Sequence, residues 1–271
     1  MIKHIFSDMD GTLLDKVGGI SATNAQAIYR LNTPFTLVSA RAPMEMDFAM
    51  DRLQLKDPQI AFNGGLIFEK NESGMNVLSE NPIDNGTVET IFKLIKDEFP
   101  EISISWYGLE HWYSERNDQG TALESRFTNL LPDIVTQNEF LDSDDTRVFK
   151  IMMIIFDEEE LQAVGKAILD LNSDLISIQR SGTYYIEVTS NKAVKSTGIQ
   201  FIMDREGLKK DELVAFGDSQ NDIPMFEAVG YPIVMDNAPK NIKELAKYVT
   251  LANHDDGISY AINNYLPTIQ A

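Results

Sequence analysis

The sequence has no cysteine, only three histidines, and few basic residues for its acidic content. Without cysteine the chain has no disulfide framework, which agrees with a reducing compartment. No apolar run approaches the roughly 20 residues that a membrane-spanning helix needs. The first residues also lack the apolar region and cleavage site of a secretory signal. We therefore expect a cytoplasmic protein with no membrane partner.

Acidic residues outnumber basic ones by 42 to 23, which gives a formal net charge of −19. A surface of this sign repels polyanions, so we expect no nucleic acid partner. Any phosphate group that binds this chain must be held by a local concentration of positive charge or of N–H donors. The 271 residues are 43% hydrophobic, which is enough for a substantial core and, at this length, for two domains.

Two carboxylates, Asp8 and Asp10, follow a short apolar segment at residues 2–7 that reads as a strand. Residues two apart on a strand point to the same side, and two neighbouring anions are unfavourable without a shared proton or a hard cation. Gly11 then permits a sharp turn. A carboxylate can act as a nucleophile towards phosphorus, and a second one can transfer protons. A lone Asp-x-Asp is often a solvated turn, but the whole pattern favours Mg²⁺-assisted chemistry on a phosphate.

A second acidic group, Asp218 and Asp222 within residues 217–222, follows another apolar segment at 213–216. A helix with Pro224 in its first turn comes next, so the order is strand, acidic loop, helix. Ligands bind at the carboxyl ends of such parallel strands. If the two strands are neighbours, the four carboxylates converge and favour a divalent cation with oxygen ligands. The alternative is that the second group merely complements a helix dipole.

Two further residues could complete a phosphate site. Ser39 ends a strand before a helix that begins near Pro43; it could donate to a phosphoryl oxygen or simply cap the helix. Lys195 begins a helix shortly before residue 213, where its charge opposes the helix dipole. That position favours a role between carboxylates and phosphate, although a solvated lysine is the alternative. Arg41 is a third candidate cation.

These residues resemble the signature motifs of the haloacid dehalogenase (HAD) superfamily of phosphohydrolases, and within it the Cof-type subfamily. The four motifs occur in order at residues 8–12, Ser39, Lys195 and residues 217–222. The Asn63-Gly64 pair after the strand at 59–62 also resembles a turn of Cof-type members. One position departs from the pattern: Cof-type members commonly have glycine after the motif lysine, whereas this chain has Ser196. Lys192 is therefore the alternative motif lysine.

The resemblance implies roles for the motif residues. Asp8 is the expected nucleophile and Asp10 the expected acid and base. Mg²⁺ is expected to be held by Asp8, the main-chain carbonyl of Asp10, Asp218 and, directly or through water, Asp222. The expected phosphate-binding residues are Ser39, Lys195, Gly11 and Asn221, and possible substrate contacts are Arg41, Asn63 and Trp112.

Spacing predicts the arrangement of domains. Between residues 39 and 195, one strand–helix step needs about 40 residues, and what remains is the size of one further domain. We predict an α/β fold: a Rossmann-like parallel-sheet core from residues 1–83 and 186–271, with an inserted α+β cap at 84–185. By resemblance this cap is of the C2B type. Inside it, Val88, Ile91, Phe92 and Ile95 have helical spacing, and residues 102–106 alternate like a strand.

The sequence therefore predicts a magnesium-dependent phosphatase for small phosphorylated metabolites, acting through an aspartyl-phosphate and existing as a monomer or weak homo-oligomer. The cap is expected to select the leaving group. Its aromatic stretch from Trp106 to Trp112 and Tyr113, with Arg116 at its basic end, could stack on a ring or could be ordinary core. Two alternatives stay open: a phosphomutase or phosphotransferase of the phosphomannomutase type, and a non-catalytic protein that binds a phosphorylated ligand.

Overall fold

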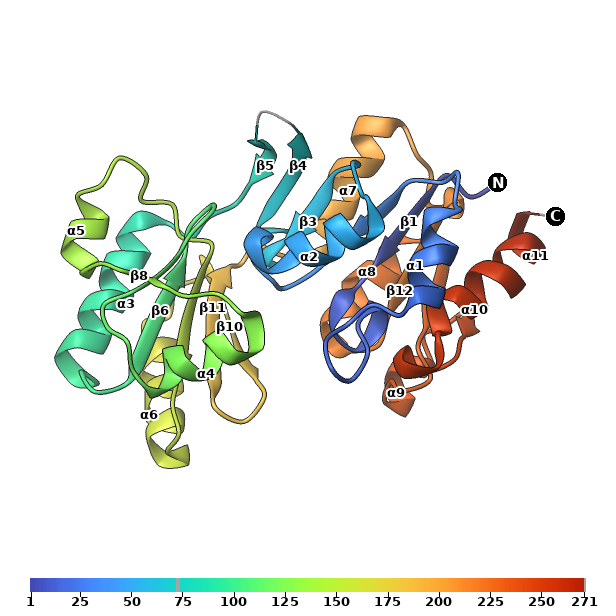
Figure 1. Cartoon of the computed structure of the whole chain (residues 1–271). Helices are drawn as coiled ribbons and strands as arrows, with labels where there is room; N and C mark the ends of the chain where they lie inside the picture. Colours follow the sequence, from blue (N-terminus) through green and yellow to red (C-terminus); the bar gives the residue numbers. More distant parts are fainter. Residues whose placement is uncertain (72–73, 271) are drawn as a thin grey trace. The chain divides into compact units, whose positions relative to one another are not determined.

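The computed structural model describes residues 1–71 and 74–270. Contacts between residues divide the chain into two compact units (Figure 1). The first unit comprises Met1–Arg41, Met46–Glu80 and Val194–Ala271, and the second comprises Ala42–Glu45 and Asn81–Ala193. Within the described residues, none of the helices has the length and apolar character that crossing a membrane would require.

The first unit is built on a parallel five-stranded sheet with the order β14-β13-β12-β1-β2. Its strands are short, and every residue of β12, β1 and β2 is buried, as expected where a sheet is covered on both faces. They are β1 (His4–Ser7), β2 (Phe35–Leu37), β12 (Leu213–Gly217), β13 (Tyr231–Val234) and β14 (Tyr248–Val249).

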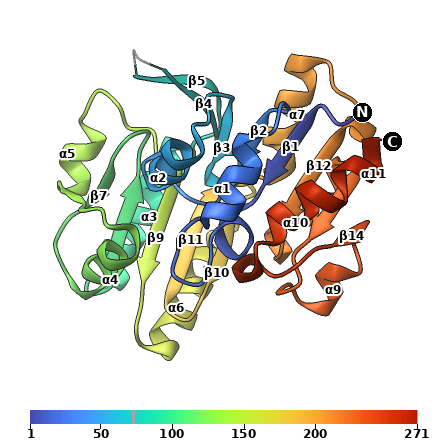
Figure 2. The same cartoon turned by 45° about the vertical axis from the view of Figure 1, so that its right-hand side comes forward.

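Helices pack on both faces of this sheet. Helices α1 (Ala22–Tyr29) and α10 (Gly257–Asn264) contact each other on one face, which Figure 2 shows in front of the sheet. On the other face, α7 (Lys195–Glu206) and α8 (Ile223–Ala228) bury a cluster that includes Phe6, Ile199 and Phe226. The remaining helices of this unit are α2 (Pro43–Leu53), which starts in the segment assigned to the second unit, and α9 (Lys240–Lys243) and α11 (Leu266–Gln270).

A three-stranded antiparallel sheet extends the core beside β2. It consists of β3 (Gln59–Ala61), β4 (Leu66–Asn71) and β5 (Gly74–Glu80) in that order. An isolated parallel bridge between Val38 and Ile60 joins β3 to the end of β2. The carboxyl ends of β12, β1, β2 and β3 therefore follow one another along one edge of the core.

The second unit is a six-stranded sheet with the order β10-β11-β9-β6-β7-β8, antiparallel apart from the β7–β8 pair. Helix α3 (Asn85–Glu98) and helix α6 (Glu158–Asp170) bury its main apolar cluster, whereas α4 (Gln119–Thr128) contacts β6 and β9. The other elements of this unit are α5 (Gln137–Leu141), β6 (Ser103–Tyr107), β7 (Trp112–Ser114), β8 (Asp133–Ile134), β9 (Lys150–Ile154), β10 (Ile176–Ser181) and β11 (Tyr185–Ser190).

The alternation of strand side chains separates the two faces of this second sheet. Ile104 and Trp106 of β6 belong to the apolar cluster, whereas Tyr107 lies close to Lys150, whose Nζ is 4.3 Å from the centre of the Tyr107 ring. The predicted helix at Val88–Ile95 and the predicted strand at 102–106 correspond to α3 and β6. An α/β core with a separate α+β unit confirms the predicted fold class.

Candidate active site

Asp8, Lys195, Asp218 and Asp222 meet at the carboxyl edge of the parallel sheet. Strands β1 and β12 are adjacent and in parallel register, with Ser7 opposite Phe216. Asp8 and Asp218 each follow directly after one of these strands. Ligand oxygens of Asp8, Asp218 and Asp222 all lie within 4.8 Å of one another. Strands β1 and β12 are therefore neighbours, as the predicted convergence of carboxylates requires. Their pairing brings together residues from opposite ends of the chain.

Lys195 is buried between two of these carboxylates. Its Nζ donates to Asp8 Oδ1 at 2.5 Å and to Asp222 Oδ1 at 2.7 Å, and its side chain is 1% exposed. Burial alone would lower the pKa of Lys195, but the charges of Asp222 and Asp8 outweigh it and raise that pKa above its usual range. Lys195 is therefore a cation, and it neutralises one of the two carboxylates that it contacts.

Asp8 has one satisfied oxygen and one unsatisfied oxygen. Among the described residues, its buried Oδ2 has no hydrogen-bond partner. Burial raises the pKa of Asp8, an effect that Lys195 opposes and Asp222 reinforces. Burial likewise raises the pKa of Asp218 to about 6. A buried carboxylate oxygen without a donor is costly, and a divalent cation with oxygen ligands would relieve that cost. The donor set thus fits a metal ion.

Both carboxylate oxygens of Asp222 accept hydrogen bonds from the protein. Its Oδ2 accepts from the backbone N–H groups of Asp218 at 2.9 Å and Ser219 at 3.0 Å, while its Oδ1 faces Lys195. Asp222 therefore holds the Lys195 ammonium group and the loop that carries Asp218 in position. Asn221 lies in the same loop, where its Oδ1 accepts from the Ser219 hydroxyl.

Asp10 forms a bidentate ion pair with Arg41. The Arg41 Nε and Nη2 atoms donate to the two Asp10 oxygens at 2.8 and 2.7 Å. The Asp10 side chain is 58% exposed, unlike that of Asp8. The two-point contact fixes the orientation of this solvent-exposed Asp10 carboxylate.

Gly11 is required by both conformation and space. Its φ is +80°, and a Cβ atom there would lie 2.5 Å from Asp218 Oδ2. An alanine at this position would be strained and would displace the Asp218 carboxylate. Gly11 thus allows the turn after Asp10 to run close against the second acidic loop.

Ser39 and Asn63 follow β2 and β3 along the same edge. The buried Ser39 side chain accepts a bond from the backbone N–H of Arg41 at 3.1 Å, and the Asn63 N–H donates to the Ser39 carbonyl at 2.7 Å. Trp112 lies in the second unit, where it stacks on Tyr107 with ring centres 5.8 Å apart.

Sequence reasoning did not single out two residues that shape the site. The Thr12 hydroxyl donates to Asp218 Oδ1 at 2.8 Å, and the Asn237 side chain donates to the Gly11 carbonyl at 2.8 Å. Asn237 lies three residues after the end of β13. Its position beyond the carboxyl end of another parallel strand could have indicated that it belongs to the site. Thr12 lies within the first motif.

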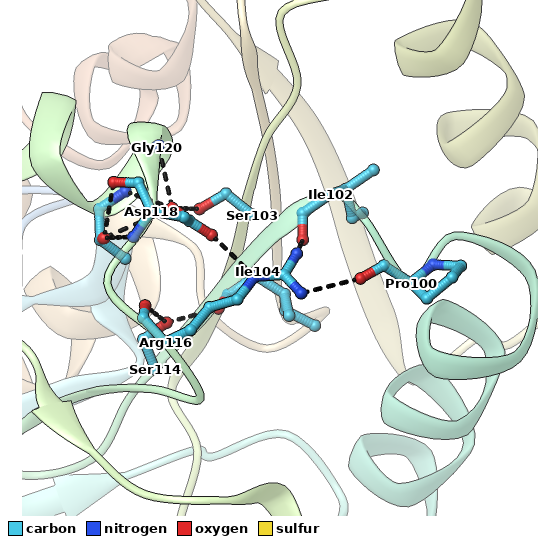
Figure 3. A network of polar contacts seen from close by, with 9 residues as sticks. Pro100, Ile102, Ser103, Ile104, Ser114, Arg116, Asp118 and Gly120 are labelled. Atoms are coloured by element: carbon cyan, nitrogen blue, oxygen red, sulfur yellow. Dashed lines mark hydrogen bonds and ion pairs between the residues drawn. The ribbon is translucent and has the colours of Figure 1, made fainter.

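Arg116 of the second unit has structural partners. Figure 3 shows its guanidinium directed at the main-chain carbonyls of Pro100 and Ile102, to which it donates at 3.0 and 2.9 Å. It also contacts Asp118, which caps helix α4 and accepts from Ser103. These bonds tie the chain after β7 to the start of β6. Trp106 is fully buried against Phe92, so this ring belongs to the core.

Comparison with known proteins identifies the family. Residues 5–262 match the sequence model of the haloacid dehalogenase-like hydrolases. The chain therefore belongs to this family, which confirms the resemblance inferred from the four motifs.

Individual relatives align over nearly the whole chain. A Haemophilus influenzae protein provisionally named a phosphatase is 29% identical over 98% of this chain and 99% of its own. A 5-amino-6-(5-phospho-D-ribitylamino)uracil phosphatase of Bacillus subtilis is 26% identical, with 98% of each chain covered. The crystal structure of a Thermotoga maritima protein superposes with a TM-score of 0.87 at 26% identity, covering 97% of both chains.

Proposed function

We propose that this protein is a magnesium-dependent phosphatase that hydrolyses small phosphorylated metabolites through an aspartyl-phosphate on Asp8. The observation that carries the proposal is the buried Asp8 carboxylate beside Asp218: one of its oxygens accepts from Lys195, and the other has no partner within the part of the chain that the structure describes. Membership of a hydrolase family and relatives named phosphatases support the same reaction class.

Asp8, Asp218 and the main-chain carbonyl of Asp10 would hold the metal ion, with Asp222 acting through water because its Oδ1 accepts from the Lys195 ammonium and its Oδ2 from two backbone N–H groups. When bound, Mg²⁺ would neutralise carboxylate charge and polarise a phosphoryl oxygen. Lys195 and the Ser39 hydroxyl bind other phosphoryl oxygens as charge shifts across them.

The carboxylates supply the covalent steps. An Asp8 oxygen attacks phosphorus while the bond to the leaving oxygen breaks, and protonated Asp10 gives its proton to that oxygen. A water molecule then attacks the phosphorus of the aspartyl-phosphate, Asp10 takes its proton, and the Asp8 carboxylate and inorganic phosphate are released. Arg41 orients Asp10 between these steps through its two-point contact.

Replacement of the nucleophile tests this proposal. Asp8→Asn should lower inorganic phosphate release from p-nitrophenyl phosphate by at least about 10³-fold, because the amide cannot form the acyl phosphate. The fold should persist, as judged by circular dichroism. Asp51→Asn, which removes an exposed carboxylate of the same unit, is the matched control and should retain full activity.

Replacement of Asp10 should allow the aspartyl-phosphate intermediate to be detected directly. In Asp10→Asn, p-nitrophenol leaves without help from an acid, but the attacking water loses its base. Acid-quenched protein should then carry one phosphoryl group on Asp8 by mass spectrometry. Asp8→Asn with normal turnover, or activity that survives chelation of Mg²⁺, would contradict the proposal.

The same assay separates hydrolysis from phosphoryl transfer to a second hydroxyl. A phosphatase releases phosphate from a sugar phosphate alone, whereas a phosphomutase needs an activating bisphosphate. The cytoplasmic location and the monomeric or weakly associated state stay predictions.

A further inference from the structure

A short segment next to the candidate site belongs to the other unit. Contacts between residues assign Ala42–Glu45 to the second unit, whereas Arg41 before it and Met46 after it belong to the first. Arg41 is the residue that contacts both oxygens of Asp10. The peptide bond from Arg41 to Ala42 therefore links the partner of Asp10 directly to residues that pack with the second unit.

Glu45 holds this segment in place. Its Oε2 accepts from the backbone N–H of Ala42 at 2.6 Å, and the Glu45 N–H donates to the Ala42 carbonyl at 3.0 Å. Ala42 is fully buried, and Glu45 is 5% exposed. The Glu45 carboxylate lies in the first turn of α2, and it fixes the main chain immediately after Arg41.

A buried cation of the second sheet faces this carboxylate. The Lys150 Nζ on β9 is 3.9 Å from Glu45 Oε2, and the two side chains are 6% and 3% exposed. The same Nζ is 4.3 Å from the centre of the Tyr107 ring. At 3.9 Å the contact with Glu45 is an attraction between charges and not a hydrogen bond. The exclusion of water strengthens that attraction.

Lys150 also acts on a second acid of the same unit. Glu124 of α4 is buried, and this burial raises its pKa; the charge of Lys150 opposes the rise and the charge of Glu45 adds to it. Without Lys150, the carboxylates of Glu45 and Glu124 would repel each other where little water is present. Glu45 would then be displaced or protonated, and either response weakens its charge-assisted bond to the Ala42 N–H.

We propose that Lys150 is a positioning residue for proton transfer by Asp10. It acts through Glu45 and the Ala42 N–H on Arg41, whose guanidinium orients the Asp10 carboxylate. This inference rests on the proposed phosphatase function. Loss of Lys150 leaves Asp8 in place but loosens Arg41, so Asp10 is less often aligned with the leaving oxygen.

Two aryl phosphates with different leaving groups test this role. p-Nitrophenolate leaves without help from an acid, whereas phenolate needs a proton from Asp10. Lys150→Met should therefore lower kcat/KM about tenfold for phenyl phosphate and less than about twofold for p-nitrophenyl phosphate. The ratio of the two values does not depend on the fraction of protein that is folded, so a merely structural role would leave the ratio unchanged.

Two further variants test whether the effect passes through Glu45 and Asp10. Glu45→Gln keeps an oxygen that can accept from the Ala42 N–H but removes the charge, and it should change the ratio in the same direction. Asp10→Asn should change the ratio further. Adding Lys150→Met to Asp10→Asn should then have no additional effect on the ratio, because the acid is already absent.

The matched control is Lys166→Met, which removes a lysine of the second unit that is 77% exposed. It should leave both kcat/KM values unchanged. The position of Arg41 can also be followed without turnover, because its Nε proton is hydrogen-bonded to Asp10. Exchange of this proton with water, measured by NMR, should be several-fold faster in Lys150→Met and unchanged in Lys166→Met.

An equal loss on both esters in Lys150→Met, or no loss on either, would overturn the role of Lys150. So would a further change of the ratio in the double variant, or an unchanged exchange rate of the Arg41 proton. A wild-type protein that releases phosphate from neither ester would instead refute the proposed phosphatase function, and the exchange rate would still report whether Lys150 positions Arg41.

Discussion

Lys195 carries a positive charge into a region from which water is almost wholly excluded. Its two carboxylate partners come from different loops, at Asp8 and Asp222. Because each of these anions would otherwise be buried without a positive charge beside it, the lysine stabilises the fold in addition to its proposed role in phosphate binding. The same side chain therefore links the stability of the core to the chemistry of the site.

Lys195→Met should destabilise the metal-free protein by about 3–5 kcal/mol, because it leaves two buried carboxylates unpaired. It should also lower phosphatase activity by at least about 100-fold. Urea unfolding in the presence of a chelator measures the first effect. The control is Lys192→Met, since Lys192 is exposed and is the alternative motif lysine; it should change stability by less than about 0.5 kcal/mol. The opposite ranking of the two variants would transfer the motif role to Lys192.

Residue types and their order predicted that carboxylates from the two acidic motifs would lie close together. They did not predict which hydrogen bonds and ion pairs these side chains form. The Arg41–Asp10 ion pair joins two residues that the sequence analysis treated separately. The Thr12 bond to Asp218 was also not anticipated. Such contacts depend on rotamers and on the twist of adjacent strands, which a linear pattern does not contain.

The turn from Phe62 to Gly64 shows how one local element positions several functional groups. Its N–H groups bind the segment that carries Ser39 and Arg41, and Gly64 lies against the residue before Lys195. A change in this turn should therefore affect the positions of both the Ser39–Arg41 segment and the start of α7.

Gly64→Ala should lower the free energy of unfolding by about 2–4 kcal/mol, because it adds strain at positive φ to a clash with backbone. Gly207→Ala is the control: Gly207 also has a positive φ, of 66°, but no atom of the described residues lies within 4 Å of the position that a Cβ would take. It should cost only about 1 kcal/mol. Chemical denaturation compares the two, and equal losses would show that the contact with Val194 is unimportant.

Elements with a clear period were predicted well, and those defined by polar contacts were not. All four spaced residues of α3, from Val88 to Ile95, are buried. Helix α4 was missed because it begins with a polar capping box, between Asp118 and Thr121, rather than with an apolar repeat. The β4–β5 hairpin also went unpredicted, since most of β5 is only partly buried and lacks a strong pattern.

Across the molecule as a whole, the acidic excess contrasts with a site that concentrates positive charge locally. The net charge is −19, yet Lys195 and Arg41 both form ion pairs with carboxylates of the candidate site. A divalent cation would add to this local compensation. Proton binding and metal binding then compete for the same carboxylates.

The thermal stabilisation by Mg²⁺ should therefore be larger at pH 8 than at pH 5. The pKa values of Asp8 and Asp218 are raised in the folded protein, the latter to about 6. The folded state thus binds more protons than the unfolded state between about pH 4 and these values. The stability that these groups contribute is complete below about pH 4 and is lost as pH rises through the folded pKa values. Mg²⁺ would offset this loss once the carboxylates are ionised.

Differential scanning calorimetry with and without Mg²⁺ at both pH values measures the effect, with NaCl of equal ionic strength as the control. We expect a rise in Tm of several degrees at pH 8, since a ligand at 100 times its Kd stabilises by about 2.7 kcal/mol. An identical shift at pH 5 and pH 8 would argue against binding to Asp8 and Asp218.

The place of β1 between β12 and β2 has a consequence for biosynthesis. The register pairs His4 with Leu213, so one of the two neighbours of this apolar strand is made long after it. During synthesis, Ile5 and Phe6 therefore stay exposed and prone to aggregation until β12 emerges from the ribosome. Chaperones that shield nascent apolar segments should therefore influence the yield of active enzyme in cells, and chains that stop short of Leu213 should remain inactive.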